Sequence, residues 1–332
     1  MRRVEINLGW ACNNDCVFCG EQDRREHSRK TGQFLIPGDK VRADLRRFRE
    51  EGFDHLTFLG GEPTIRKDMI TLVRFARDLG FRYVFMTTNG RRMADRRFLR
   101  SLLRAGLTDL CVSVHGPDAE THDAMTVRPG SFAQTERALL NLVLERQRFH
   151  VSSVLARGSI EKAAELVRYL HQFRPTHIYL ALPNPAGGAY RRFREIYPTY
   201  SEAGPLVRAA LAEARALGQM ATIAKLPYCH LEGFEGYSDA LFWGSEYKRQ
   251  INVQVEDAID MRFADRSALA ITCERCRYRL ICEGVEAHYV NLRGVSELVP
   301  VEGELVTDPG DLRATGPLQA ARASFAGRKS TE

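Results

Sequence analysis

The chain has 332 residues, of which 44% are hydrophobic and 27% are charged, and its formal net charge is +6. This composition is that of a folded soluble protein, and the length leaves room for one large domain and one smaller domain. No uncharged apolar run is long enough to cross a bilayer, and the N-terminus has no signal-peptide core. We therefore expect a cytoplasmic protein without a membrane partner.

Thiols stay reduced in the cytoplasm, so the cysteines are predicted to bind metal rather than to form disulfides. Cys111 is the exception, and we expect it to be a small apolar residue buried in mid-strand. The arginines are scattered over predicted helices, and no long basic tract or interleaved aromatic stripe appears. A nucleic-acid partner is therefore not expected.

The first predicted strand, residues 4–8, leads into a loop with Cys12, Cys16 and Cys19 in the spacing C-x3-C-x2-C. Three thiolates on one loop can bind three irons of a cubane cluster and leave the fourth iron open for chemistry. A zinc site that lacks one ligand is the alternative. This spacing, with the aromatic Phe18 before the third cysteine, resembles the signature of the radical S-adenosylmethionine (SAM) enzymes. The resemblance implies a [4Fe-4S] cluster whose open iron binds SAM and whose electron cleaves it to a 5′-deoxyadenosyl radical.

Further strand-like runs alternate with helices of 3.6-residue period. The helix at 68–79 stops before Gly80, the helix at 95–105 is capped by Asp95 and ends at Gly106, and a third helix begins at Ser159. Such repeats build right-handed βαβ units in a parallel sheet. The expected strands lie at 4–8, 55–59, 83–87, 109–114, 150–155 and 177–182. These six units resemble the partial (β/α)6 TIM-like barrel of the radical SAM family, and residues 191–225 are expected to add a helix and a strand that close it. Chemistry in such barrels lies at the C-terminal ends of the strands.

The strand at 55–59 ends in Gly60-Gly61-Glu62-Pro63. The glycines let the backbone approach a ligand closely, and Glu62 offers an acceptor for an ammonium group. The resemblance implies that this run holds the SAM amino group. Without the cysteine loop, the same letters would indicate only a turn.

The next two strands end at Asn89 and Ser113, which the resemblance places along the SAM and substrate cavity. It also implies that Arg128 pairs with the SAM carboxylate. His115 is a candidate general acid or base, or else it hydrogen-bonds its own loop. Asn89-Gly90 is also a common turn pair. The loop 183–188 either closes over the cofactor or lies in solvent.

A second set of cysteines lies in the last third of the chain: Cys273, Cys276 and Cys282, with Cys229 upstream. The spacing C-x2-C-x5-C followed by glycine resembles the SPASM and twitch extensions of radical SAM enzymes. A SPASM domain needs seven or eight ligands for two clusters, so four cysteines favour one auxiliary [4Fe-4S] cluster. The alternatives are a four-thiolate zinc site and a cluster that Cys229 does not complete.

We therefore expect a radical SAM barrel at 1–225, an auxiliary iron–sulfur domain at 226–295 and a partly disordered tail at 296–332. The predicted enzyme abstracts hydrogen from a small molecule or a peptide, in natural-product or cofactor biosynthesis. It takes its electron from a donor such as flavodoxin or ferredoxin. The alternative is a cysteine-rich zinc protein that acts as an adaptor or binds nucleic acid without redox chemistry.

Overall fold

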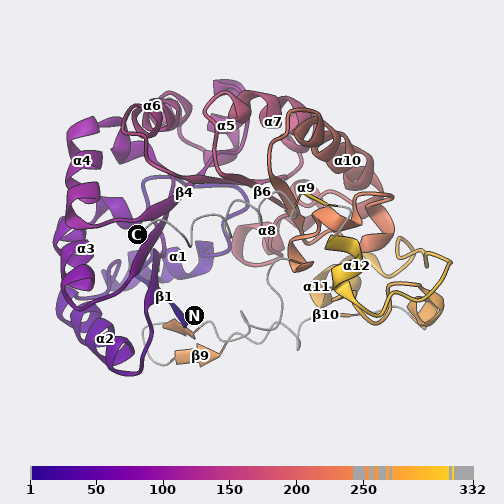
Figure 1. The fold of residues 1–332 in the computed structure, drawn as a ribbon, viewed down its shortest axis with the longest axis horizontal. Helices are drawn as coiled ribbons and strands as arrows, with labels where there is room; N and C mark the ends of the chain where they lie inside the picture. The colour runs from indigo at the N-terminus through magenta and orange to yellow at the C-terminus, as the bar shows by residue number, and fades with distance from the viewer. Residues whose placement is uncertain are drawn as a thin grey trace, which may run out of the picture.

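A curved sheet of consecutive parallel strands forms the body of the protein (Figure 1). The computed structural model describes residues 2–241, 251–253, 258–260, 267–268, 271–313 and 316–317. Within them the sheet order is β7-β6-β5-β4-β3-β2-β1-β8-β9, and every pair is parallel except β8–β9. The strands are β1 Arg3–Asn7, β2 His55–Leu59, β3 Tyr83–Thr88, β4 Asp109–Ser113, β5 His150–Val154, β6 His177–Ala181, β7 Ala221–Ala224, β8 Ile251–Val253 and β9 Ala258–Asp260.

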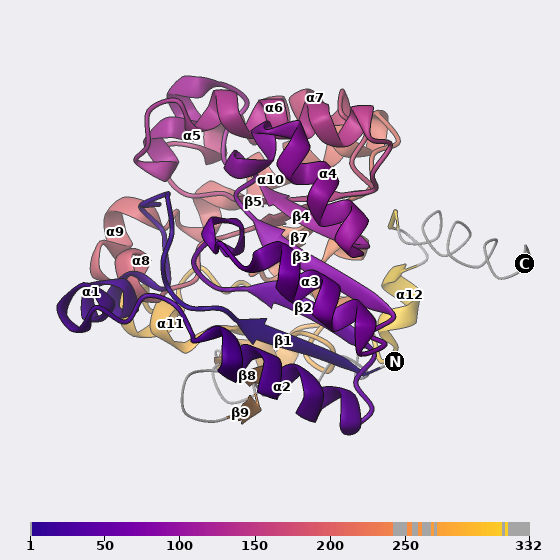
Figure 2. The ribbon, with the colours of Figure 1, turned by 90° about the vertical axis from the view of Figure 1, so that its left-hand side faces the viewer.

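Helices cover the convex side of this sheet, and Figure 1 shows α2, α3, α4, α6, α7 and α10 in sequence around the arc. Figure 2 shows that α1, α8 and α9 lie instead at the end toward which the strands point. The helices of the barrel are α1 Gln22–Thr31, α2 Gly38–Glu50, α3 Met69–Asp78, α4 Arg96–Ala105, α5 Ala119–Thr126, α6 Ser131–Leu144, α7 Ala163–His171, α8 Gly187–Arg191, α9 Phe193–Ile196 and α10 Tyr200–Ala216.

The expected partial TIM-like α/β barrel is confirmed, and the strand predicted to follow the helix in 191–225 is β7. The signals at the helix ends act as predicted for α4. Asp95 accepts a hydrogen bond from the Arg97 amide, and Gly106 ends the helix with φ 107°. The helix predicted from Ser159 is present as α7, but it begins with a 3-10 turn and Ser159 is not a side-chain cap. A 3-10 turn occupies Ile160–Lys162, and the Ser159 hydroxyl donates to the Ala156 carbonyl instead of capping a helix.

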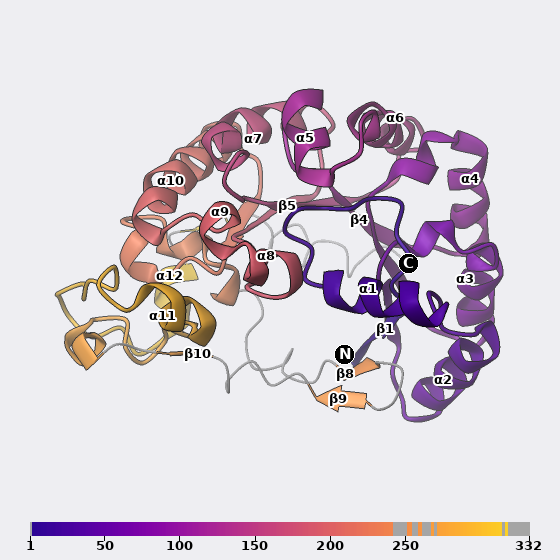
Figure 3. The same cartoon turned by 180° about the vertical axis from the view of Figure 1, so that it is seen from behind.

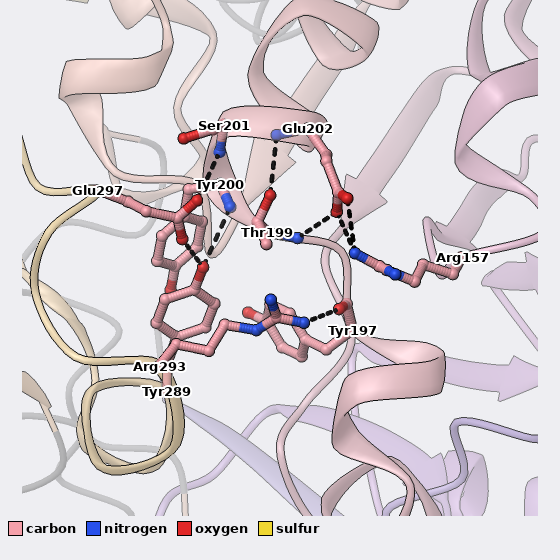
Figure 4. A network of polar contacts seen from close by, with 9 residues as sticks. All are labelled: Arg157, Tyr197, Thr199, Tyr200, Ser201, Glu202, Tyr289, Arg293 and Glu297. Carbon is pink, nitrogen blue, oxygen red and sulfur yellow. Dashed lines mark hydrogen bonds and ion pairs between the residues drawn. The ribbon is translucent and has the colours of Figure 1, made fainter.

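The C-terminal part contains β10 Ser267–Ala268, β11 Val285–Glu286, α11 Ala287–Arg293 and α12 Pro309–Arg313. It is joined to the start of α10 by a polar network (Figure 4). The Tyr289 hydroxyl accepts from the Tyr200 amide at 3.1 Å and donates to Glu297, which also accepts from the Ser201 amide at 3.3 Å. Arg293 donates to the Tyr197 carbonyl at 3.0 Å. These bonds hold α11 and the segment after it against the barrel.

The residues after α11 are partly packed in this region, because Leu298 and Val306 are buried. The end of the expected disordered tail, from residue 318 onward, lies outside the described residues. Across the described part of the chain, no helix combines the length and the apolar character needed to span a bilayer.

Candidate active site

The loop with Cys12, Cys16 and Cys19 joins β1 to α1 and lies at the C-terminal ends of the strands, in front of them in Figure 3. Main-chain hydrogen bonds hold this cysteine loop from two sides. The amides of Asp15 and Val17 donate to carbonyls at the end of α5, those of Thr126 and Met125, at 2.9 and 3.0 Å. The loop's position is therefore set largely by the backbone.

On the other side, the loop packs against the Gly60-Gly61-Glu62 turn after β2. The Gly61 amide donates to the Gly9 carbonyl and the Glu62 amide to the Ala11 carbonyl, both at 2.7 Å. A Cβ atom at Gly61 would lie 2.1 Å from the Ala11 oxygen, and one at Gly60 would lie 2.6 Å from the Gly9 oxygen. The close backbone approach predicted for these glycines therefore exists, and the partner seen is the cysteine loop itself.

A second pair of glycines approaches the loop from the opposite side of the barrel. Gly187 and Gly188 begin α8, and the Gly188 amide donates to the Cys19 carbonyl at 3.1 Å. A Cβ atom at Gly187 would lie 2.6 Å from the Gly20 oxygen. The sequence analysis left two positions for the loop 183–188, closed over the cofactor or in solvent. The structure packs its glycine end on the cysteine loop. The sequence feature that could have indicated this close contact is the Gly-Gly pair shortly after a strand.

The three thiols of the loop are partly buried and free. Burial raises the pKa of Cys12 to about 11 and raises the pKa values of Cys16 and Cys19 as well. The Asn14 amide points at the Cys12 sulfur, 3.4 Å away. Such thiols are protonated at neutral pH without metal, and metal binding releases their protons. Soft sulfur ligands suit an iron–sulfur cluster.

Glu62 is buried at the N-terminus of the 3-10 turn Pro63–Ile65, and its carboxylate bridges the loops after β2 and β3. Oε1 accepts from the Thr64 amide at 3.0 Å and from the hydroxyls of Thr64 and Thr88 at 2.6 Å, and Oε2 accepts from the Asn89 amide at 2.7 Å. Burial raises the pKa of Glu62, and these four bonds oppose that effect. Each carboxylate oxygen has about two acceptor sites, so Oε1 is fully used, whereas Oε2 accepts one bond and keeps a second acceptor site. The prediction that Glu62 accepts from the SAM ammonium stays a prediction.

Asn89 is brought to the cysteine loop, as the resemblance implied. Its side-chain nitrogen, Nδ2, donates to the Asn13 side chain at 2.6 Å and lies 4.0 Å from the Cys12 sulfur. Arg91, which the sequence did not single out, donates to the Asn13 carbonyl and to the Asn14 side chain. The end of β3 therefore braces the first half of the loop.

Phe18 and His115 are in ring contact, with centroids 4.7 Å apart. The Nδ1 atom of His115 accepts from the Val154 amide at 3.2 Å, which leaves the proton of the neutral ring on Nε2. Burial lowers the pKa of His115 to about 3. These contacts favour the role in which His115 bonds its own surroundings over the predicted acid–base role.

Ser113 and Arg128 are placed differently. The Ser113 hydroxyl is half-buried at the end of β4 and lies 3.4 Å from the Ser152 hydroxyl. Arg128 is exposed in the turn between α5 and α6. The structure therefore places Ser113 at the C-terminal ends of the strands, on the same side as the cysteine loop, but does not bury Arg128 beside that loop.

The four C-terminal cysteines line one pocket: Cys229, Cys273, Cys276 and Cys282. Burial, together with a smaller effect of the neighbouring thiols, raises the pKa of Cys229 to about 12. The sulfurs of Cys276 and Cys282 accept from the amides of Val301 and Gly284, each at 3.4 Å. Cys229 therefore shares a site with the cysteines that follow it in the chain. Within the described ranges, no three His, Cys, Asp or Glu side chains converge on a point where one metal ion could be held.

The radical SAM superfamily profile matches residues 6–170, which hold the cysteine loop, the Gly-Gly-Glu-Pro turn and the first strands of the barrel. The chain belongs to the radical SAM superfamily. This assignment carries the cofactors that the superfamily implies, a [4Fe-4S] cluster and SAM.

Two relatives indicate the range of proteins to which the chain is similar. It is 27% identical over 175 residues to the AdoMet-dependent heme synthase of Nitratidesulfovibrio vulgaris, covering 52% of this chain and 46% of the relative. It is 30% identical over 123 residues to a probable GTP 3′,8-cyclase of Saccharolobus solfataricus, covering 37% of this chain and 38% of the relative. The chain thus spans less than half the length of these curated relatives.

Solved structures share the fold at low sequence identity. One is native anSMEcpe with bound AdoMet, with TM-score 0.65, 13% identity and coverage of 100% of both chains. Another is Streptococcus suis SuiB bound to S-adenosylmethionine, with TM-score 0.62, 16% identity and coverage of 91% of this chain and 76% of that one. These likenesses support the barrel assignment alone.

Proposed function

We propose that the chain is a radical SAM enzyme in which Cys12, Cys16 and Cys19 hold the SAM-binding cluster. The observation that carries this assignment is the backbone-fixed loop that presents three thiols at the C-terminal ends of the strands. When bound, the cluster and SAM supply a 5′-deoxyadenosyl radical that abstracts hydrogen from the substrate. The protein holds the cysteine loop in place through three segments, the loops after β2 and β3 and the start of α8. We call these segments and the cysteine loop the frame of the site.

The residues proposed to face SAM lie around this frame, and their roles differ. Asn89 and Ser113 lie at neighbouring strand ends, where they can orient SAM or the substrate. The Gly60–Pro63 turn lies directly against the cysteine loop, so a molecule bound at an open iron lies near its backbone. Phe18 forms an apolar wall with its neighbours Met125, Ala156, Ala189 and Ile196. Arg128 would need to move from its exposed position to meet a carboxylate.

We further propose that Cys229, Cys273, Cys276 and Cys282 hold one auxiliary [4Fe-4S] cluster. The shared pocket and the N–H···S hydrogen bonds support this proposal, because amides that point at cluster sulfurs are a normal means of tuning such centres. Four thiolates on zinc converge on one ion, whereas in a cubane each thiolate binds a different iron. Zinc at these four cysteines is the alternative, which metal analysis distinguishes from iron.

The substrate class stays broad: a small molecule or a peptide, with an electron donor such as flavodoxin or ferredoxin. The heme synthase and cyclase relatives favour a cofactor-type small molecule over a peptide, but they match only part of their length. Localisation in the cytoplasm stays a prediction from the sequence.

Metal analysis of anaerobically purified protein tests the proposal. We expect about eight irons per chain and absorption near 400 nm. Replacing Cys12, Cys16 and Cys19 by alanine should halve the iron and abolish dithionite-driven SAM cleavage. Cys276→Ala should also halve the iron but leave slow, uncoupled SAM cleavage at the first cluster.

Cys111→Ala is the matched control, because Cys111 lies buried in mid-strand β4, away from both cysteine sets, and should change neither value. Production of 5′-deoxyadenosine by the triple variant would contradict the ligand assignment. Stoichiometric zinc, lost in Cys276→Ala, would show a structural metal site instead. A colourless wild-type protein that holds only zinc would favour the adaptor function.

A further inference from the structure

Arg25 is a buried cation beside the cysteine loop. It lies on α1, six residues after Cys19, and its side chain is only 8% exposed. Its Nη1 atom lies 3.0 Å from Oδ1 of Asp15, which sits in the loop between Cys12 and Cys16. Burying a guanidinium is unfavourable unless anionic partners compensate, so its position against the three thiols calls for an explanation.

Arg25 lies close enough to all three thiols of the loop to act on each of them electrostatically, and its side chain also hydrogen-bonds Cys19. Two carboxylates act in the opposite direction, Glu62 on Cys12 and Glu21 on Cys19. Arg25 is thus the cation that the three sulfurs share.

Other cations of α1 are placed differently. Arg24, the preceding residue, has a side chain that is 40% exposed and pairs with Glu21 at 3.0 Å. Exposed charges are screened by water and salt, whereas a buried charge acts through a medium of lower dielectric constant. The helix therefore offers a buried arginine and an exposed one at adjacent positions, which is a natural matched pair.

We propose that Arg25 sets the reduction potential of the cluster held by Cys12, Cys16 and Cys19, an inference that rests on the proposed function. Reduction adds one electron from a low-potential donor, and no bond forms or breaks. The added negative charge is stabilised by the buried guanidinium and by its hydrogen bond to a ligand sulfur, two factors that tune iron–sulfur potentials. Asp15 opposes the effect, because its carboxylate lies next to the guanidinium.

A potentiometric titration with dithionite tests this, with the SAM-responsive EPR signal of the reduced protein as the reporter of the first cluster. In Arg25→Gln, which keeps amide donors but loses the charge, the midpoint should fall. The reduced-to-oxidised ratio at the wild-type midpoint should drop at least tenfold, which is 59 mV for a one-electron couple. Arg25→Lys, which retains the charge, should recover part of the shift, and Arg24→Gln should leave the potential unchanged.

Asp15→Asn gives an independent test, because it removes the counter-ion and leaves Arg25 in place. Its midpoint should rise, a change of opposite sign that a merely structural role would not produce. The Asp15→Asn variant still tests the inference if the Arg25→Gln protein does not retain iron. An unchanged midpoint in an iron-loaded Arg25→Gln or Asp15→Asn variant, or an equal shift in Arg24→Gln, would overturn the inference alone. A wild-type protein without any SAM-responsive signal would contradict the proposed function as well.

Discussion

Replacing Glu62 distinguishes a residue that braces the site from one that binds SAM. In Glu62→Ala, the amides of Thr64 and Asn89 lose the acceptors that lie 3.0 and 2.7 Å away. The hydroxyls of Thr64 and Thr88 can rotate toward other acceptors, but the amides cannot. A buried donor left without a partner costs about 1–3 kcal/mol, so the two amides together cost about 2–6 kcal/mol. Release of the buried charge offsets part of this loss.

Glu62→Gln is the graded comparison. Its carbonyl oxygen can keep the bonds now made by Oε1, but its NH2 group faces the Asn89 amide, donor against donor. Only one buried amide then lacks an acceptor, which predicts a loss of about 1–3 kcal/mol. The exposed Glu51, just beyond α2, is the control, and Glu51→Ala should lower stability by less than about 0.5 kcal/mol.

The assay is anaerobic denaturant unfolding of all three variants, with the SAM dissociation constant measured by calorimetry on the same samples. If Glu62 mainly braces the loops after β2 and β3, stability falls in the order wild type, glutamine, alanine. If it binds the SAM ammonium instead, SAM affinity falls about tenfold to a hundredfold, as for a charge-assisted bond. Unchanged stability in Glu62→Ala together with such an affinity loss would refute the bracing argument.

Two further predictions follow from the same geometry. Gly61→Ala should lower stability by about 1–3 kcal/mol and reduce iron content, because its Cβ would meet the Ala11 backbone; in Gly20→Ala, the nearest atom is 3.7 Å away and neither value should change. Burial lowers the pKa values of His115 and His177 to about 3 and of His122 to about 4. Between pH 6.5 and 4 only the unfolded chain binds these protons, so the free energy of unfolding should decrease as the pH is lowered, by up to about 1.4 kcal/mol per pH unit for each histidine. Replacing one of them by asparagine should flatten the curve, whereas His27→Asn, at an exposed position, should not.

The strands were predictable because their signals are local. Runs of β-branched and apolar residues placed β1–β6 within one residue or so, and Asp95 and Gly106 marked the ends of α4. The cysteine loop was recognisable because its three ligands are close in sequence. What local patterns could not supply were the partners of each motif: Gly61 meets Ala11, and Gly187 meets Gly20 across the barrel.

Glu62 shows the same limit at a single side chain. Its spacing from the cysteine loop suggested a ligand to SAM, yet most of its acceptor sites are occupied by Thr64 and by residues at the end of β3. Thr64 is a local partner, but Thr88 and Asn89 become neighbours of Glu62 only when β2 and β3 pair in register, His55 opposite Tyr83. Some partners of a carboxylate at the end of one barrel strand thus come from the neighbouring strand. A sequence motif on a single segment cannot identify them.

Cys229 depends on the tertiary structure most of all. It lies in a 3-10 turn, Tyr228–His230, shortly after β7, far along the chain from Cys273. The next residue, His230, bonds the Glu297 carbonyl at 2.8 Å, and its own carbonyl accepts from Arg208 of α10 at 2.9 Å. Glu297 in turn bonds Tyr289 of α11. The contacts that hold the C-terminal part against the barrel therefore also hold the turn that places Cys229 in one pocket with the three later cysteines.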